Sequence, residues 1–363
     1  MKYATVPFAV KAMHDKIILK NYKTYPMSNP QQQIHKQPVD TLVIGAGLSG
    51  LCAAGDLQQA GHSVLLVDKG RGLGGRLAGR RIGEASFDHG AQFMTTRHPR
   101  FAETVKQWVA AGIAEEWYSS FPGLSSSDGG HPRYRGIPSM TAVAKQLASG
   151  LNILQSVRVE TIAQFDQLWQ VTLDNGDTQT ARSLVITSPV PQSLELLANF
   201  PLADDKRARL ERIEYEACIA VMAVLDSPSK IPAPGAMLLD SGPIAWLGDN
   251  QQKGVSKLPA MTIHGSADFS QQHFDLDRQQ AGQLLIDAAQ PYLGANVTDY
   301  QVHGWRYSKP SVVDPEACML ISSDNHPPLV LAGDAFNGPR VEGAVVSGWA
   351  AAEALAPLIA LQG

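Results

Sequence analysis

The chain has 363 residues, room for roughly two domains of ~150 residues, and its 44% hydrophobic and 18% charged residues exclude a disordered, collagen-like or coiled-coil chain. The formal net charge of −4 creates no positive field that would recruit nucleic acid, so we expect no nucleic-acid partner. No uninterrupted apolar run reaches the ~18 residues of a membrane-spanning helix, and the three cysteines form no CxxC pair, which argues against a transmembrane segment, a disulfide framework and a thiolate zinc site.

The first 38 residues differ in composition from the rest of the chain. They contain six lysines, no arginine, one acidic residue (Asp15) and a run of three glutamines. The absence of arginine argues against a mitochondrial transit peptide, and Pro7 within the short apolar stretch argues against a signal peptide. We therefore expect residues 1–38 to form a flexible basic extension, with contact to a partner or a lipid surface as the alternative.

A glycine-rich turn follows the first strand-like run. Residues 41–44 are apolar, GAGLSG occupies positions 45–50, a helical pattern follows, and a second apolar run at 63–67 ends in Asp68, 23 residues after Gly45. This spacing is typical of a βαβ unit that binds a dinucleotide, because the glycines permit a tight turn, close approach of the pyrophosphate and close helix packing. The helix N-terminus favours the phosphate charge, and the acid accepts hydrogen bonds from ribose. The candidate cofactor-binding residues are Gly45, Gly47, Leu48, Ser49, Gly50 and Asp68.

Five basic residues and no acidic residue lie between positions 69 and 81, directly after Asp68. The run KGRGLGGR at 69–76 pairs basic residues with glycines. Beside a pyrophosphate site such residues supply extra anion contacts, although a solvated basic loop would have the same composition. We assign Lys69, Arg71, Gly75 and Arg76 to cofactor binding.

These motifs resemble the FAD-binding start of the flavin amine oxidase superfamily, in which GxGxxG and an acid are followed by a run that ends as Gly74-Gly75-Arg76 does here. Further stretches are similar to the renalase branch, especially its bacterial members. They are FDHGAQF at 87–93, PRYRGIPSM at 132–140 and HGWRYSKP at 303–310. The resemblance spans residues 39–360.

The resemblance implies an α/β fold with a discontinuous Rossmann-type FAD-binding domain like that of glutathione reductase and the amine oxidases, made of residues 39–95, 135–190 and 315–363. Residues 96–134 and 191–314 would form a second, α+β substrate domain built on a mostly antiparallel sheet. In that fold the backbone near Val159 would contact the adenine.

Patterns in the middle of the chain agree with this division. Residues 169–173 and 184–187 flank the turn DNG and read as a hairpin-like pair. Strand-like runs at 217–225, 236–239, 244–248, 259–264 and 298–307, with a helical pattern at 277–290, are typical of an antiparallel sheet with a helix. No second GxGxxG occurs, so we expect no separate NAD(P)H-binding domain.

The C-terminal region returns to the cofactor. An apolar strand-like run at 329–332 stops at Gly333-Asp334, and a helix opens at Val341-Glu342-Gly343-Ala344. The helix is apolar on nearly every face, so we expect it to be buried. By the resemblance, Gly333 and Asp334 contact the ribityl or pyrophosphate part of FAD, and residues 341–344 point at the pyrimidine edge of the flavin. A helix N-terminus there would stabilise the negative charge of a reduced flavin. A plain packing helix is the alternative.

Hydride transfer to a flavin needs no protein nucleophile, and the sequence shows no GxSxG elbow or metal-ligand spacing. The small residues Gly90 and Ala91, with Gln92, are candidates for the wall beside the flavin. Trp305 and Tyr307 alternate with Arg306, which places the aromatic rings on one strand face and the guanidinium on the other. The rings would be either a substrate platform or core aromatics, and Arg306 either an anion contact or a structural ion pair. Substrate positioning is assigned to Gln92, His303, Trp305, Arg306 and Tyr307.

The resemblance implies an oxidase that takes a hydride from 2- or 6-dihydro isomers of NAD(P)H and passes the electrons to O2, giving NAD(P)+ and H2O2. An amine oxidase or desaturase acting on a small amine or isoprenoid, and a non-catalytic flavin-binding factor, remain alternatives. We expect non-covalent FAD, because the neighbours of Cys318 do not match the Ser-Gly-Cys-Tyr pattern of thioether-linked members. We also expect no metal and a cytoplasmic location.

Overall fold

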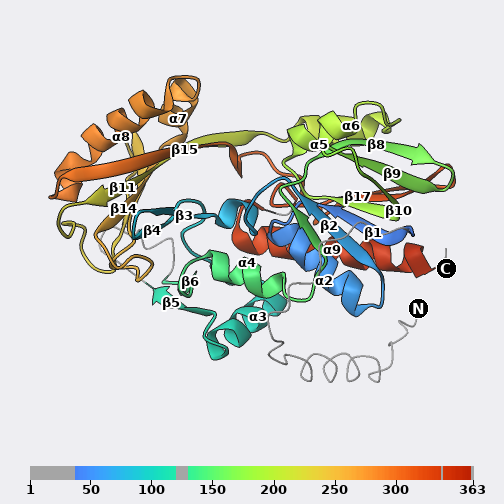
Figure 1. The fold of residues 1–363 in the computed structure, drawn as a ribbon, viewed down its shortest axis with the longest axis horizontal. Helices are drawn as coiled ribbons and strands as arrows, with labels where there is room; N and C mark the ends of the chain where they lie inside the picture. Colours follow the sequence, from blue (N-terminus) through green and yellow to red (C-terminus); the bar gives the residue numbers. More distant parts are fainter. Residues whose placement is uncertain (1–36, 120–129, 337, 361–363) are drawn as a thin grey trace, which may run out of the picture. The chain divides into compact units, whose positions relative to one another are not determined.

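The structure is a computed structural model and describes residues 37–119, 130–336 and 338–360. The predicted extension at residues 1–38 lies outside these ranges except for its last two residues. Residues 32–363 form one compact unit, whose described part contains two main β-sheets (Figure 1).

The larger sheet has eight strands and a parallel centre. Its main path runs β16-β17-β10-β1-β2-β7, in which all neighbours are parallel except β16 and β17, and β8 and β9 extend it as an antiparallel hairpin from β10. The strands are β1 (Val39–Ile44), β2 (Val64–Asp68), β7 (Ile153–Gln155), β8 (Val159–Phe165), β9 (Leu168–Leu173), β10 (Thr178–Ile186), β16 (Met319–Ser323) and β17 (His326–Leu331). The predicted hairpin at 169–187 is therefore present as β9 and β10.

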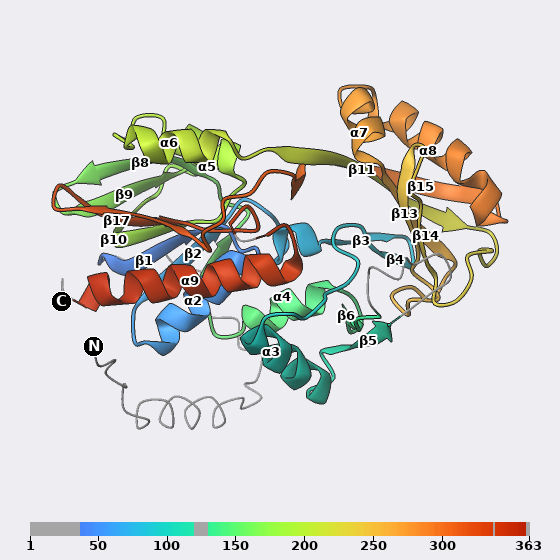
Figure 2. The same cartoon turned by 180° about the vertical axis from the view of Figure 1, so that it is seen from behind.

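Both faces of this sheet are apolar because both are covered. Val43, Val185 and Val330 pack in one core cluster with helices α2 (Leu48–Gln59) and α9 (Val341–Ala360). Leu42, Leu184 and Leu329, one residue away on each strand, pack in a second cluster on the opposite face, with α5 (Val190–Leu196) and α6 (Asp204–Glu211). Figures 1 and 2 show α2 and α9 side by side below the sheet and α5 and α6 above it.

Helix α9 is, within the described residues, the one helix whose length and composition would allow it to cross a membrane. Half of its most apolar window is buried inside the protein, against α2 and the sheet, and this packing accounts for its apolar character. The expectation of burial on nearly every face holds only for the first half. Glu353, Pro357 and Ala360, all in the second half, are exposed.

The smaller main sheet has five antiparallel strands in the order β12-β13-β14-β11-β15. Helices α7 (Ala267–His273) and α8 (Arg278–Leu293) cover one face, where Ile219, Val221 and Ile263 belong to the core. The strands match the predicted runs and are β11 (Tyr215–Leu225), β12 (Ala236–Leu238), β13 (Ile244–Asp249), β14 (Ala260–Gly265) and β15 (Val297–Pro310).

Two short hairpins, two α-helices and one 3-10 helix complete the described fold. The hairpins are β3 (Gly79–Ile82) with β4 (Ala85–Asp88) and β5 (Ala114–Tyr118) with β6 (Arg133–Gly136), and the helices are η1 (Gly75–Leu77), α3 (Pro99–Ala110) and α4 (Thr141–Leu147). Phe101, Val105 and Trp108 of α3 belong to the same core cluster as α2 and α9. The sequence analysis placed α3, as part of residues 96–134, in the substrate domain. The domain boundaries themselves stay a prediction.

Candidate functional site

The turn between β1 and α2 contains glycines of two kinds. A Cβ on Gly45, whose φ is +109°, would lie 2.5 Å from Thr187 Oγ1, and one on Gly50 would lie 1.9 Å from the Gly45 carbonyl oxygen. The fold itself therefore requires these two glycines. Gly47 has an ordinary φ of −73°, and no atom lies within 4 Å of the place of its Cβ. No packing contact requires a glycine there, and close approach of a pyrophosphate remains the role that the motif predicts for it.

Polar groups at the same turn also fit a bound nucleotide. The Ser49 hydroxyl is buried at the start of α2 and has no hydrogen-bond partner among the described residues, and Leu48 beside it is buried. The Asp68 carboxylate accepts the Ala46 N–H at 2.5 Å and the Gly70 N–H at 2.6 Å. A carboxylate has about four acceptor positions, so ribose hydroxyls can still bind to it.

The structure brings the other predicted nucleotide residues to this end of the sheet. The Val157 N–H donates to the Asp68 carbonyl oxygen at 3.1 Å, which places the chain just before Val159 beside the acid. Gly75 packs on Gly47, with 3.5 Å between its Cβ position and the Gly47 Cα. The Lys69 ammonium donates a hydrogen bond to the Gln192 side-chain oxygen at 3.0 Å, and Arg71 is exposed.

Arg76 and Asp334 contact each other. The Arg76 guanidinium donates to both Asp334 carboxylate oxygens, at 2.7 and 2.6 Å, and to the carbonyl oxygens of Tyr307 and Ser308 at 3.3 and 3.1 Å. Arg76, which was predicted to bind an anion of the cofactor, therefore pairs with a carboxylate of the protein and with carbonyl oxygens of β15. The pair joins the glycine loop, the end of β15 and the Gly333-Asp334 turn.

The start of α9 is held by hydrogen bonds and close packing within the protein. The Gly333 N–H donates to the Ser347 hydroxyl at 2.8 Å, and a Cβ on Gly343 would meet the Gly338 carbonyl oxygen at 2.0 Å. The buried Glu342 carboxylate accepts the backbone N–H groups of Arg97 and His98, both at 2.6 Å, just before α3. Glu342 thus anchors that chain segment, whereas Val341 and Ala344 beside it are half-buried.

Four cross-strand partners form a row over the five-stranded sheet. Trp246 on β13 pairs with His264 on β14, His264 with Ala220 on β11, and Ala220 with His303 on β15. Trp305 lies two residues beyond His303 and so shares its face. This face is opposite to the one that α7 and α8 cover.

The predicted wall lies against this face. The Trp305 indole N–H donates to the His89 carbonyl oxygen at 3.2 Å, and a ring nitrogen of His264 lies 3.1 Å from the same oxygen. The His89 ring stacks on Trp305 at 5.4 Å between centroids and meets His303 edge-on at 5.2 Å. We call His89, His264, His303 and Trp305 the imidazole–indole group.

The three histidines of this group are neutral at neutral pH. Burial is the main cause that lowers the pKa of His89 to about 3 and that of His264 to about 4, and burial also lowers the pKa of His303. The Nδ1 atom of His89 is buried and has no partner within the described residues. The group therefore offers neutral hydrogen-bond donors and acceptors beside flat rings, and no strong base.

Tyr307 and Arg306 do not join the imidazole–indole group. The Tyr307 ring packs edge-on against Tyr215 at 5.4 Å. Arg306 is exposed, lies 3.2 Å from the Asp275 carboxylate and covers the Phe274 ring at 4.4 Å. Arg306 was predicted to be either an anion contact or a structural ion pair, and these contacts match the ion pair.

Gln92 is used internally, together with a pair that the sequence analysis missed. Its amide donates to the carbonyl oxygens of Asp88 and Gly90 at 2.7 and 3.0 Å and accepts from Lys253 at 3.3 Å. The Lys253 ammonium lies 2.9 Å from the Asp88 carboxylate, and both side chains are fully buried. Burial lowers the pKa of Lys253, and Asp88 opposes that shift. Lys253 stands in a polar stretch that reads as an ordinary loop, so no sequence signal marked it.

Gly90 and Ala91 connect the two parts of the site. A Cβ on Gly90 would lie 2.0 Å from the Arg76 carbonyl oxygen, and the Ala91 N–H donates to that oxygen at 2.9 Å. The turn that follows His89 therefore packs directly on Arg76, next to the Gly75 that packs on Gly47.

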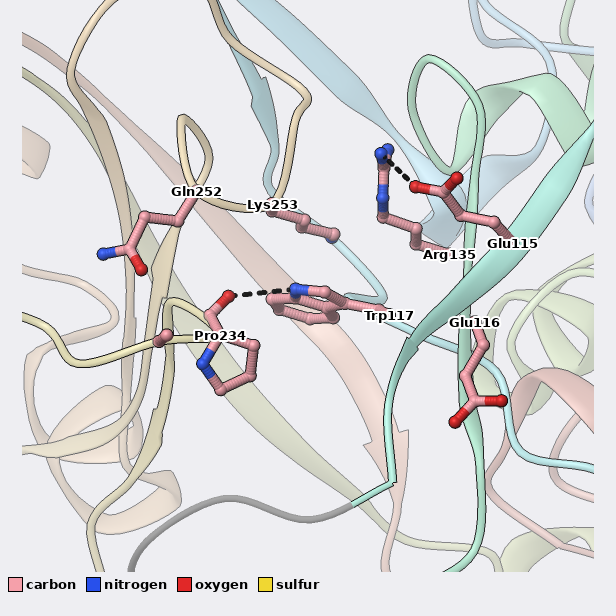
Figure 3. Close-up of a pocket in the computed structure, with 8 residues that line it drawn as sticks. Glu115, Glu116, Trp117, Arg135, Pro234, Gln252 and Lys253 are labelled. Atoms are coloured by element: carbon pink, nitrogen blue, oxygen red, sulfur yellow. Dashed lines mark hydrogen bonds and ion pairs between the residues drawn. The ribbon is translucent and has the colours of Figure 1, made fainter.

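A separate cavity of about 380 Å³ lies near Lys253 (Figure 3). Trp117 forms part of its wall and donates its indole N–H to the Pro234 carbonyl oxygen at 3.0 Å. The Lys253 ammonium lies over the Trp117 ring, 4.9 Å from its centroid. Apart from Lys253, its lining is Glu115, Glu116, Trp117, Arg135, Ala233, Pro234 and Gln252. None of the predicted site residues lines it. No three potential metal ligands come together in the described ranges.

Comparison with family models matches residues 43–108 to an NAD(P)-binding Rossmann-like domain and residues 119–356 to the flavin containing amine oxidoreductases. Renalase of Mus musculus is 26% identical over 332 residues, which cover 84% of this chain and 95% of that protein. (S)-6-hydroxynicotine oxidase of Paenarthrobacter nicotinovorans is 33% identical over 128 residues, 33% of this chain and 29% of that protein.

Among solved structures, putrescine oxidase bound to putrescine has a TM-score of 0.65 and 15% identity over 88% of this chain and 99% of that chain. This likeness shows a shared fold. The predicted fold class and the resemblance to renalase are confirmed. The amine oxidoreductase match covers well over half of the sequence, and the open space at Gly47 fits its nucleotide cofactor. The chain therefore belongs to the flavin-containing amine oxidoreductase family and is a flavin-dependent oxidoreductase similar to renalase.

Proposed function

We propose that the protein is an FAD-dependent oxidase acting on 2- or 6-dihydro isomers of NAD(P)H. The overall reaction balances as dihydronicotinamide dinucleotide plus O2 plus H+ giving NAD(P)+ plus H2O2. The observation that carries the proposal is the imidazole–indole group, which is joined through Gly90 and Ala91 to the loop that packs on the predicted nucleotide turn at Gly47. The similarity to renalase over most of both chains supports it.

When bound, the flavin supplies the redox chemistry, accepting a hydride from the substrate and delivering the electrons to O2. The residues must then hold a flat ring and keep water away. Trp305 and His303 present ring surfaces from β15, and neutral imidazoles can exchange hydrogen bonds with an uncharged polar group. Loss of a hydride from a dihydronicotinamide leaves an aromatic cation, so no substrate proton has to be removed.

The absence of a proton-removal step favours a dihydronicotinamide over an amine as substrate. Small amines are protonated at neutral pH and must lose a proton before they can be oxidised, which calls for a base with a pKa near the working pH. The pKa values of about 3 for His89 and about 4 for His264 make these histidines poor bases.

We further propose that the cofactor is FAD, held without a covalent bond, and that the protein works in the cytoplasm. Burial raises the pKa of the Cys318 thiol to about 11, so it stays protonated and is a poor nucleophile towards a flavin. Acid precipitation should release all the yellow colour into the supernatant as FAD. Colour retained in the pellet would refute the non-covalent assignment. The three free cysteines support a reducing compartment.

The test of the reaction is anaerobic stopped-flow mixing of the purified holoprotein with each candidate donor. Dihydro isomers of NAD(P)H should bleach the flavin rapidly, and small amines should not. Fast bleaching by an amine, with none by the dihydro isomers, would overturn the proposal. Oxygen consumption with matching peroxide formation checks the second half of the reaction.

A further inference from the structure

Arg80, on β3, lies next to the strand β15 that carries His303 and Trp305 of the imidazole–indole group. Its guanidinium, on β3, donates to the Gln301 side-chain oxygen at 3.1 Å. Gln301 and His303 are two residues apart on β15 and therefore share a face. Both views show β3 near the sheet that contains β15 (Figures 1 and 2).

The charge of Arg80 reaches the same group. After burial, it is among the causes that lower the pKa of His89 and of His303. Arg80 is nevertheless exposed, so a ligand can reach it from solvent.

The charge of Arg80 is also uncompensated. No carboxylate within the described residues pairs with it, and its single hydrogen bond goes to a neutral amide. Arg76, four residues earlier, differs because Asp334 neutralises it. A guanidinium has five N–H donors, so Arg80 keeps most of them available.

We propose that Arg80 binds a phosphate group of the substrate and thereby selects nucleotides over substrates without phosphate. The inference rests on the proposed function, since a dinucleotide carries its pyrophosphate one ribose away from the nicotinamide ring. A planar guanidinium forms paired, charge-assisted hydrogen bonds with phosphate oxygens, which an ammonium or an amide does not reproduce. The imidazole–indole group contacts the ring, and Arg80 contacts the tail.

Arg81 supplies a matched control. It is the next residue on β3, is exposed and has no carboxylate partner within the described ranges, but strand alternation directs it to the other side. Arg80→Gln and Arg81→Gln change the net charge equally. A difference between the two variants therefore reports position and not overall charge.

The experiment measures NAD+ binding from the perturbation of the flavin spectrum, and anaerobic flavin reduction by a dihydronicotinamide dinucleotide and by the corresponding riboside, which has no phosphate. Arg80→Gln should weaken NAD+ binding about tenfold, the loss expected for a charge-assisted hydrogen bond. It should raise the half-saturating concentration of the dinucleotide similarly, leave the limiting reduction rate unchanged and leave the riboside unaffected. Arg81→Gln should behave as the wild type.

Equal NAD+ binding by the wild type and Arg80→Gln would overturn the assignment, and so would an equal loss for dinucleotide and riboside. These results concern the variants only. Failure of any dihydronicotinamide to reduce the wild-type flavin would instead overturn the proposed function, and this inference with it.

Discussion

Substituting valine for Gly47 separates the needs of the fold from those of the cofactor. The backbone at Gly47 has φ −73°, which valine can adopt, and the Cβ meets no protein atom within 4 Å. The apoprotein should fold, losing about 1 kcal/mol for a poorer residue at the start of α2. The added methyl groups would fill the space through which a pyrophosphate must approach the backbone.

The loss of flavin affinity follows from the displaced phosphate. Each charge-assisted hydrogen bond to a backbone N–H contributes about 1.5–3 kcal/mol, so losing one weakens binding roughly 10- to 150-fold. The assay is flavin stoichiometry after purification and dialysis, with circular dichroism to confirm folding. Gly50→Ala is the contrasting variant, because its Cβ would lie 1.9 Å from the Gly45 carbonyl oxygen and should prevent folding. A Gly47→Val protein that keeps a full complement of flavin would refute the reasoning, and so would one that cannot fold.

Trp305→Ala should slow flavin reduction by dihydro-NAD isomers up to about tenfold, since aromatic stacking contributes roughly 0.5–1.5 kcal/mol, while Trp305→Phe keeps most of the rate. Loss of flavin or of solubility in Trp305→Ala would mean that the ring is a core residue. Lys253→Met should lower the free energy of unfolding by about 3–5 kcal/mol because it leaves Asp88 buried and unpaired, and adding Asp88→Asn should restore much of it, as measured by denaturant unfolding. The folded-state pKa values of His89 and His264 lie below the ordinary 6.5, so the folded protein binds fewer protons than the unfolded chain. The free energy of unfolding should reach its plateau above about pH 6.5 and fall as the pH drops towards 4, with a slope of up to about 1.4 kcal/mol per pH unit for each histidine. Unfolding free energies that stay constant from pH 7 to pH 5 would contradict the burial of neutral imidazoles.

Local signals in the sequence were sufficient for the βαβ unit that carries the predicted nucleotide residues. The glycines at 45, 47 and 50 and the acid at 68 act over one βαβ unit, where spacing along the chain dictates spacing in the fold. The alternation of Trp305 and Arg306 was predictable for the same reason, because a strand has a period of two.

The tertiary structure decided which polar groups are available. Glu342 and Arg76 were assigned to the cofactor from their position in the chain, and they contact the segment before α3 and Asp334, which are distant in sequence. Lys253 gave no signal at all, because a buried lysine is defined only by the carboxylate that reaches it, here 165 positions away along the chain. The imidazole–indole group likewise depends on the register of three strands and on a turn from another region, and no local pattern encodes that register. The sequence by itself thus determined the family, the strands and the glycine turn, since these show in short motifs and in the local pattern of apolar residues. The partners of each charged side chain depended on long-range packing.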